Sequence, residues 1–150
     1  KGFGAGAKKA LTPAFTATIL YVLVYIAAYN PIILTIVKPI IELTSNFNVV
    51  TTSLTAIVSH FFNVELYFSA SNMLSYITSV YTDSAVYGVI GVIWQATYGL
   101  TMLFVPSSVL LVTVLSYLNV SYLKWLKTIW KLLLQLLVLL LAVFLIIAII

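Results

Sequence analysis

Cysteine and arginine are both absent from this chain of 150 residues. Without cysteine the chain can form no disulfide, no thiolate metal site and no cysteine nucleophile. Without arginine it lacks the guanidinium fork that commonly reads the edges of bases, which argues against sequence-specific binding of nucleic acid. These two absences exclude several kinds of chemistry before any motif is considered.

Charge is also scarce, because charged residues make up 7% of the chain and hydrophobic residues 63%. Soluble domains carry about 25% charged residues. The few charges that exist give a formal net charge of +4, and every basic residue is a lysine. A single core of this size cannot hide so much apolar surface from water, so we expect lipid to cover part of the chain. The length suits one domain.

Four apolar runs that contain no charged side chain dominate the sequence, at 13–37, 84–105, 107–123 and 132–150. At 1.5 Å per residue, the last run forms a helix of about 28 Å, close to the thickness of the hydrocarbon layer. The run at 107–123 is short for a full crossing. The sequence therefore predicts an all-α, polytopic integral membrane protein with about four hydrophobic helices and one short amphipathic helix.

Four prolines are expected to shape these helices. Pro13 fits the first turn of the first span. Pro31 lies two-thirds of the way along that span and is expected to kink it, and Pro106 is expected to do the same between the second and third spans. Pro39, which follows Lys38, is expected to end the first span.

The segment 40–83 is more polar than the rest of the chain. Within it Val50, Leu54, Ile57 and Phe61 recur with helical spacing, which predicts a short amphipathic helix that lies on the membrane or packs on the spans. A second short helix is expected to follow, from about Ser71 to Val80, with Ser71 or Asn72 as its cap.

Only one pair of residues in this segment, His60 and Glu65, suits acid–base or metal chemistry. Their spacing of five places them on different faces of a helix, and only Glu42 and Asp83 remain to complete a metal site of three or four ligands. The apolar runs hold no acidic, basic or histidine side chain, which argues against a proton pump or a voltage sensor. We predict no enzyme activity, no catalytic residue and no cofactor or metal site, and we expect these polar groups at the water interface.

A stripe of small residues follows one face of the expected helix at 84–105. Small residues in a row let the backbone of another helix approach closely, and a glutamine among them can form a hydrogen bond across the contact. We predict that this small-residue stripe is a helix-packing surface. Its members are Ser84, Gly88, Gly91, Gln95 and Gly99.

Lysine and tryptophan gather directly before the last apolar run. Lysines with aromatic residues at the head of a span form an interfacial belt. We therefore predict an anchor at 124–131 that holds the last helix at the lipid headgroups. The anchor consists of Lys124, Trp125, Lys127, Trp130 and Lys131.

Residues 1–12 form a second basic segment, an arm rich in glycine and alanine with Lys1, Lys8 and Lys9. These lysines are expected to make loose contacts with phosphate groups of lipid or of nucleic acid. The arm is expected to lie at the lipid headgroups, and the alternative is an arm that binds a partner. The positive-inside rule places both lysine groups on one side of the membrane. Four crossings separate them and three crossings bring them together, so the number of crossings and the sidedness stay open.

Two resemblances to known families bear on function. The stretch KKALTPAFTATILYVLV, from Lys8 to Val24, resembles the start of an archaeal type IV pilin, although the lysines remain on the chain and its far end is hydrophobic where a pilin has a β-rich head. In overall style, the charge-poor chain of hydrophobic helices rich in Ser, Thr and Tyr is similar to the coat proteins of lipid-containing spindle-shaped archaeal viruses. That resemblance implies a structural role in a virion envelope.

The sequence therefore favours a structural membrane subunit of a larger assembly, in a cell membrane or a virion envelope. It is expected to be either a viral coat or envelope protein or an accessory subunit of a membrane complex such as a respiratory one. Its expected partners are membrane lipids and other membrane subunits or copies of itself. The alternative is a small channel or transporter with polar residues along a common path, namely Gln95, Thr97, Thr101 and Thr113.

Overall fold

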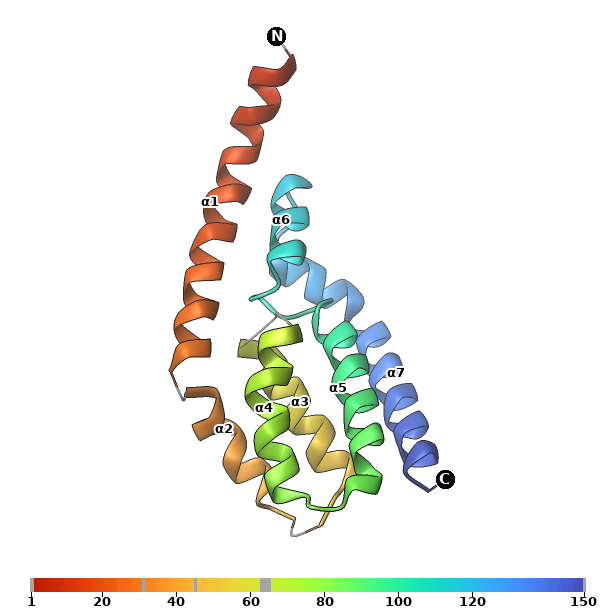
Figure 1. Cartoon of the computed structure of the whole chain (residues 1–150). Helices are drawn as coiled ribbons and strands as arrows, with labels where there is room; N and C mark the ends of the chain where they lie inside the picture. Colours follow the sequence, from red (N-terminus) through yellow and green to blue (C-terminus); the bar gives the residue numbers. More distant parts are fainter. Residues whose placement is uncertain (1, 31, 45, 63–65, 150) are drawn as a thin grey trace.

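The computed structural model describes residues 2–30, 32–44, 46–62 and 66–149. Over these ranges the chain forms only helices and turns, which confirms the predicted all-α class (Figure 1). The elements are α1 (Gly2–Tyr29), α2 (Ile32–Ile41), α3 (Val49–Phe62), α4 (Leu66–Val80), the 3-10 turn η1 (Ser84–Val86), α5 (Tyr87–Thr101), α6 (Val109–Tyr117) and α7 (Tyr122–Ile149).

The basic arm is helical and belongs to α1. Strong helix formers (Ala5, Ala7 and Ala10 with the adjoining lysines) carry the helix back to Gly2. Pro13 consequently lies inside α1 and not in its first turn, where we expected it. The side chain of Pro13 is buried. Lys1 lies outside the described residues.

The first predicted span is divided between α1, which ends at Tyr29, and α2, which begins at Ile32. Pro31, the expected kink, lies outside the described residues. The expectation that Pro39 ends the span is wrong, because α2 contains both Lys38 and Pro39. The physical reason is packing, since α2 buries Ile33, Val37 and Ile41 on one face and Ile41 holds the last turn against the core.

The polar segment 40–83 folds into α3 and α4. Asn48 caps α3, because its Oδ1 accepts the backbone N–H of Val50 at 2.9 Å and that of Thr51 at 3.2 Å. The expected second helix begins at Leu66, five residues before the predicted cap at Ser71, and ends at Val80 as predicted.

The spans predicted at 84–105 and 107–123 become shorter helices. Helix α5 ends at Thr101 after 15 residues, and α6 has 9 residues. Turns occupy 102–108, so Pro106 lies in a connection between two helices rather than in a kinked one. The Oγ of buried Ser108 accepts the backbone N–H of Leu111 at 3.3 Å and caps α6.

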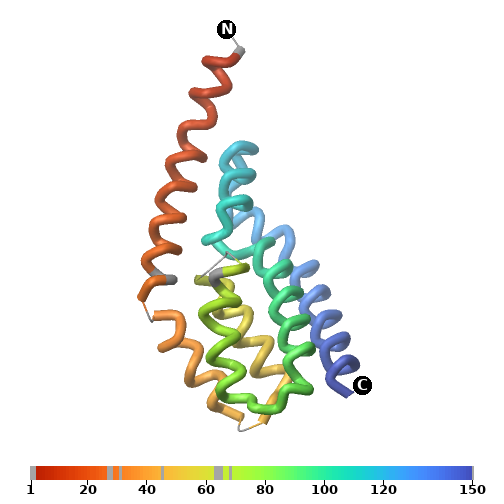
Figure 2. Tube along the Cα trace, in the orientation of Figure 1, coloured from red at the N-terminus to blue at the C-terminus, as the bar shows by residue number. Residues whose placement is uncertain are grey.

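Two helices of the described chain are long and apolar enough to cross a membrane, α1 over Phe3–Ile26 and α7 over Tyr122–Ile149. Their apolar windows are only 6% buried within the molecule. They run in the same direction, while α5 and α6 run in the opposite direction (Figures 1 and 2).

Helices α2 to α5 and α7 form one bundle, and α1 lies beside α6 along its edge (Figure 1). Helix α3 packs chiefly on α5 and α2, with α7 and α4 completing its surroundings. The apolar core of the bundle lies among these helices. It comprises Ile33, Val37, Ile41, Val49, Ala56, Met73, Ile77, Tyr81, Ile90, Ile93, Trp94 and Phe144.

Candidate functional site

Helix α3 has its polar face inside the protein and apolar side chains outside it. Five polar side chains of α3 are each at most 2% exposed. Three of the four apolar residues that define the predicted amphipathic pattern are instead exposed, Val50 at 56%, Leu54 at 46% and Phe61 at 40%. The buried polar set is Thr52, Ser53, Thr55, Ser59 and His60. A helix surrounded by water has the reverse arrangement.

A closed hydrogen-bond network surrounds His60. Its Nε2 lies 3.1 Å from the carbonyl oxygen of Trp94 in α5, and its Nδ1 lies 3.1 Å from the Oγ of Ser69 in α4. The indole N–H of Trp94 donates to the same Oγ at 3.2 Å. The imidazole also packs edge-on against the rings of Trp94 and Tyr98, with centroids 5.2 and 5.5 Å away. The network therefore joins α3, α4 and α5.

The carbonyl of Trp94 determines the protonation of His60. Because a carbonyl oxygen only accepts, Nε2 must carry the proton and donate it. In the neutral ring Nδ1 is then an acceptor, so the Ser69 hydroxyl donates to Nδ1 and accepts from Trp94. For a neutral ring this arrangement corresponds to the Nε2–H tautomer and pairs both ring nitrogens, the Ser69 hydroxyl and the Trp94 indole.

A serine beside a histidine that a third group orients is also the arrangement of an activated nucleophile. Here the exposed fractions are 1% for Ser69, 0% for His60 and 2% for Trp94, so the pair lies away from the surface in this structure. The Ser69 oxygen already accepts a hydrogen bond, which reduces its nucleophilicity. The network acts as a cross-link between helices.

The prediction that His60 lies at the water interface is wrong, because α4 and α5 cover it. Glu65 lies outside the described residues. The part of the chain that the structure describes holds no group of three His, Cys, Asp or Glu residues close enough to bind a metal ion. Sequence spacing could not reveal the true partners of His60, because Ser69 and Trp94 lie on other helices.

Four other buried hydroxyls of α3 have no hydrogen-bond partner among the described residues. They belong to Thr52, Ser53, Thr55 and Ser59. Small side chains of this kind let helices pack closely inside membrane bundles, where Ser and Thr are common at helix contacts. The four hydroxyls lie where α3 contacts its neighbours. Among the buried polar side chains of α3, His60 is the one that forms the described hydrogen bonds to α4 and α5.

The small-residue stripe of α5 lies on the outside of the chain. All five of its members are exposed. A Cβ placed on Gly88, Gly91 or Gly99 meets no other described atom within 4 Å. The opposite face of α5, with Ile90, Trp94 and Thr97 among others, makes the contacts inside the bundle. Among the described residues the stripe therefore forms no close helix contact, and its role in packing stays a prediction.

The predicted anchor forms the start of α7. The side chains of Lys124, Lys127 and Lys131 are exposed, and the Lys131 ammonium lies 5.9 Å from the ring centroid of Trp130. Trp125 faces inward and donates its indole N–H to the carbonyl of Leu103 at 2.9 Å. The anchor is thus joined to the connection between α5 and α6.

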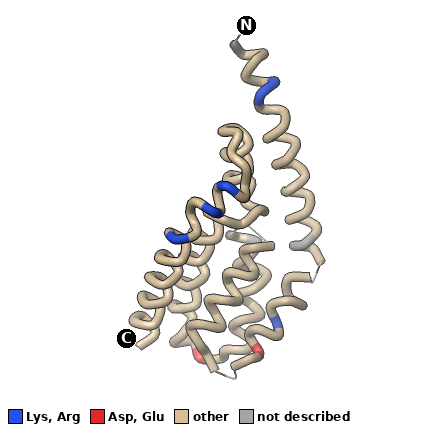
Figure 3. Tube along the Cα trace, turned by 180° about the vertical axis from the view of Figure 1, so that it is seen from behind, with Lys and Arg blue, Asp and Glu red and all other residues tan. Residues whose placement is uncertain are grey.

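The lysines of α1 and α7 lie away from the end that holds the described acidic residues, whereas Lys38 lies at that acidic end (Figure 3). The lysines of α1 and those of α7 lie toward the end where both helices begin, with those of α1 farther out. The described acidic residues lie at the other end, where Glu42 approaches Lys38 at 3.8 Å. The apolar surfaces of α1 and α7 lie between these two ends.

The polar residues considered for a channel do not share a face. Gln95 is exposed, whereas Thr97 and Thr101 are buried on the other side of α5. The hydroxyl of Thr97 donates to the Ile93 carbonyl at 2.6 Å, and that of Thr101 donates to the Tyr98 carbonyl at 2.8 Å. Hydroxyls that bond to their own helix are poor candidates for a water-filled path.

Comparison with protein-family models, with curated proteins and with solved structures finds no match to this chain.

Proposed function

We propose that the chain is an integral membrane protein that serves as a structural subunit of a larger assembly. The observation that carries the proposal is the inverted polarity of α3. Its hydroxyls and imidazole are buried, while apolar side chains such as Val50 and Leu54 face outward. Beyond Lys131 the exposed side chains of α7 are also almost all apolar, with Val138 66% exposed and Leu139 59%. Lipid is the surrounding that favours this distribution.

We further propose three membrane crossings. Helices α1 and α7 cross in one direction, and α5 followed by α6 returns as a single broken crossing. Helix α5 alone is about 22 Å long and α6 about 14 Å, both shorter than a hydrocarbon layer of about 30 Å, whereas together they exceed it. This arrangement puts both lysine groups on one side, as the positive-inside rule requires. The short helices α2, α3 and α4 then lie beside the crossings, toward the acidic end.

Two kinds of assembly fit such a subunit, a viral coat or envelope and a membrane complex in which the chain is accessory. The exposed small-residue stripe supports either one, because it offers a helix surface with no partner inside the chain. Copy number separates them. A coat contains many copies in contact with each other, whereas an accessory subunit occurs once beside other chains.

The first experiment tests membrane integration. Membranes that contain the protein are washed with alkaline carbonate, and we expect the chain to stay in the pellet. Release into the supernatant would overturn the proposal. Native mass spectrometry of the assembly, extracted in lipid nanodiscs, then counts the copies and identifies the chains that accompany them. A lone monomer with no partner under mild extraction would contradict a structural role.

The alternative function, a small channel or transporter, has less support because Gln95, Thr97 and Thr101 do not converge. It makes a separate prediction, since purified protein in liposomes would then carry ions or small solutes across the bilayer. We expect no flux above that of empty liposomes.

A further inference from the structure

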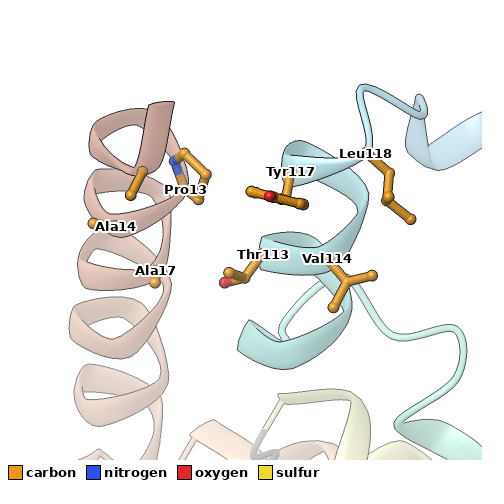
Figure 4. A pocket seen from close by; sticks show the side chains of 8 residues that line it. Pro13, Ala14, Ala17, Thr113, Val114, Tyr117 and Leu118 are labelled. Carbon is orange, nitrogen blue, oxygen red and sulfur yellow. The ribbon is translucent and has the colours of Figure 1, made fainter. Parts of the chain in front are cut away.

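A long groove runs along the contact of α1 with α6 and the end of α5. One part of it has a volume of about 430 Å³ and is lined by Pro13, Ala14 and Ala17 of α1 and by Thr113 and Tyr117 of α6. Figure 4 shows Thr113 and Tyr117 pointing across the gap toward α1. The lining is almost entirely apolar.

The groove continues along the same two helices. A second part, of about 400 Å³, is lined by Tyr21 and Val24 of α1, Met102 and Leu110 on the opposite wall, and again Thr113. The shared Thr113 makes the two parts adjoin. From residue 10 to residue 24 the α1 wall is about 21 Å long. One leaflet of the hydrocarbon layer is about 15 Å thick, so the groove is long enough for an acyl chain.

A positive charge stands at one end of this apolar groove. The Lys9 ammonium lies 4.6 Å from the ring centroid of Tyr117, whose ring forms the groove wall at that end. Lys8 adjoins it on α1, and both lysine side chains are exposed. The groove thus combines a cationic mouth with an apolar interior, which matches the two parts of an anionic phospholipid.

We propose that this groove binds one anionic phospholipid, with an acyl chain between α1 and α6 and the phosphate at Lys9 and Lys8. The lipid adds its acyl chain to the direct contact between α1 and α6 and so helps to hold α1 in place. The proposal rests on the proposed membrane location, because the groove must be reached from within the lipid. It identifies a specific lipid partner that the proposed structural role does not require.

The test uses photoreactive phospholipids in vesicles that contain the full chain. Phosphatidylglycerol and phosphatidylcholine carry the same photoreactive acyl chain, and mass spectrometry locates the labelled residues. We expect phosphatidylglycerol to label Ala14, Ala17 and Leu110 more strongly than phosphatidylcholine does. Labelling of the outward face of α7, at Val138 and Leu139, serves as the internal reference for membrane insertion and shows no headgroup preference.

Two variants separate the parts of the site. Ala17→Phe places a ring in the groove and is expected to reduce groove labelling at least several-fold, whereas Ile19→Phe on the exposed side of α1 leaves it unchanged. Lys9→Gln changes an exposed side chain and so should not impair folding. It is expected to lower the preference for phosphatidylglycerol about fivefold, the factor that corresponds to ~1 kcal/mol per lysine at a lipid surface. Lys131→Gln on α7 is the matched control.

Several results would overturn the site. Equal labelling of the groove by both lipids, unaffected by Lys9→Gln, would mean ordinary annular lipid. Cross-links from Ala17 to a second copy of the chain, with no lipid adduct, would assign the groove to another subunit. Displacement by inorganic phosphate as effective as that by unlabelled phosphatidylglycerol would reduce the site to a phosphate contact. Absence of label on α7 as well would instead refute the membrane location itself.

Discussion

The network around His60 makes a quantitative prediction for Ser69→Ala. The substitution removes one oxygen atom, which accepts from the indole of Trp94 at 3.2 Å and donates to the imidazole at 3.1 Å. Two buried polar atoms then lose their partner, while the change in side-chain volume is small. Hydrogen bonds inside membrane bundles contribute about 0.6 kcal/mol on average and up to about 1.7 kcal/mol each. Loss of both bonds should lower the free energy of unfolding by about 1–3 kcal/mol.

The assay is reversible unfolding of the purified protein by titration with sodium dodecyl sulfate in mixed micelles. Ser75→Ala is the matched control, because Ser75 lies on the same helix, is exposed, and makes only a 3.5 Å contact to the Ser71 carbonyl. The control should change the free energy of unfolding by less than about 0.5 kcal/mol, as surface substitutions generally do.

A double-mutant cycle with His60→Phe sharpens the test. Phenylalanine keeps a ring in the pocket and removes both nitrogens, so Ser69 loses one of its two partners in that background. Ser69→Ala should then be milder by about 0.6–1.7 kcal/mol, the contribution of the bond between the two side chains. Additive effects, or a Ser69→Ala cost equal to that of Ser75→Ala, would refute the network as a cross-link.

Three further predictions concern the outer face of α5, the hydrogen bond from α7 to the connection between α5 and α6, and the cap of α6. Gly91→Leu should keep or raise the stability of the isolated chain, because glycine weakens a helix interior by about 1 kcal/mol and no described atom lies within 4 Å of the added Cβ. The same substitution should reduce the association between subunits that native mass spectrometry measures. Val92→Leu is the control, because Val92 adjoins Gly91 but is not part of the stripe, and it should leave the association between subunits unchanged. If both variants associate equally well, the stripe is not a contact between subunits. Trp125→Phe removes the donor to the Leu103 carbonyl and should lower the free energy of unfolding by about 0.5–1.5 kcal/mol in the detergent titration. Ser108→Ala removes the cap of α6 and should cost about 1 kcal/mol in the same assay, with no change counting against the cap.

Much of the helical architecture could be predicted from the sequence, because apolar length and helical spacing act locally. The spacing of Val50, Leu54, Ile57 and Phe61 correctly indicated a helix at α3. Pro106 lies where the apolar stretch was expected to bend, although in a connection between two helices rather than in a kink. Spacing does not reveal which face of a helix is inside, since that depends on the surrounding solvent. The polar face of α3 is buried, whereas the same pattern in water would bury Leu54.

The errors in helix boundaries have tertiary causes. Pro39 did not end α2, because burial of Ile41 stabilises the last turn beyond it. Pro13 did not begin α1, because the alanines and lysines before it favour helix. The His60 site was missed for a related reason, since its partners lie 9 and 34 residues away in sequence on other helices. A signal existed only in composition, because a lone histidine in so apolar a chain must find buried partners.

Under the proposed membrane location, the buried polar face of α3 has a consequence for the order in which the chain enters the bilayer. During synthesis α3 emerges before α4 and α5, which supply the hydroxyl of Ser69 and the carbonyl of Trp94. A nascent α3 that entered lipid alone would expose His60 and several hydroxyls to hydrocarbon. Stable insertion of α3 therefore has to wait for α5, and the segment from residue 49 to residue 101 should enter the bilayer as one cooperative unit.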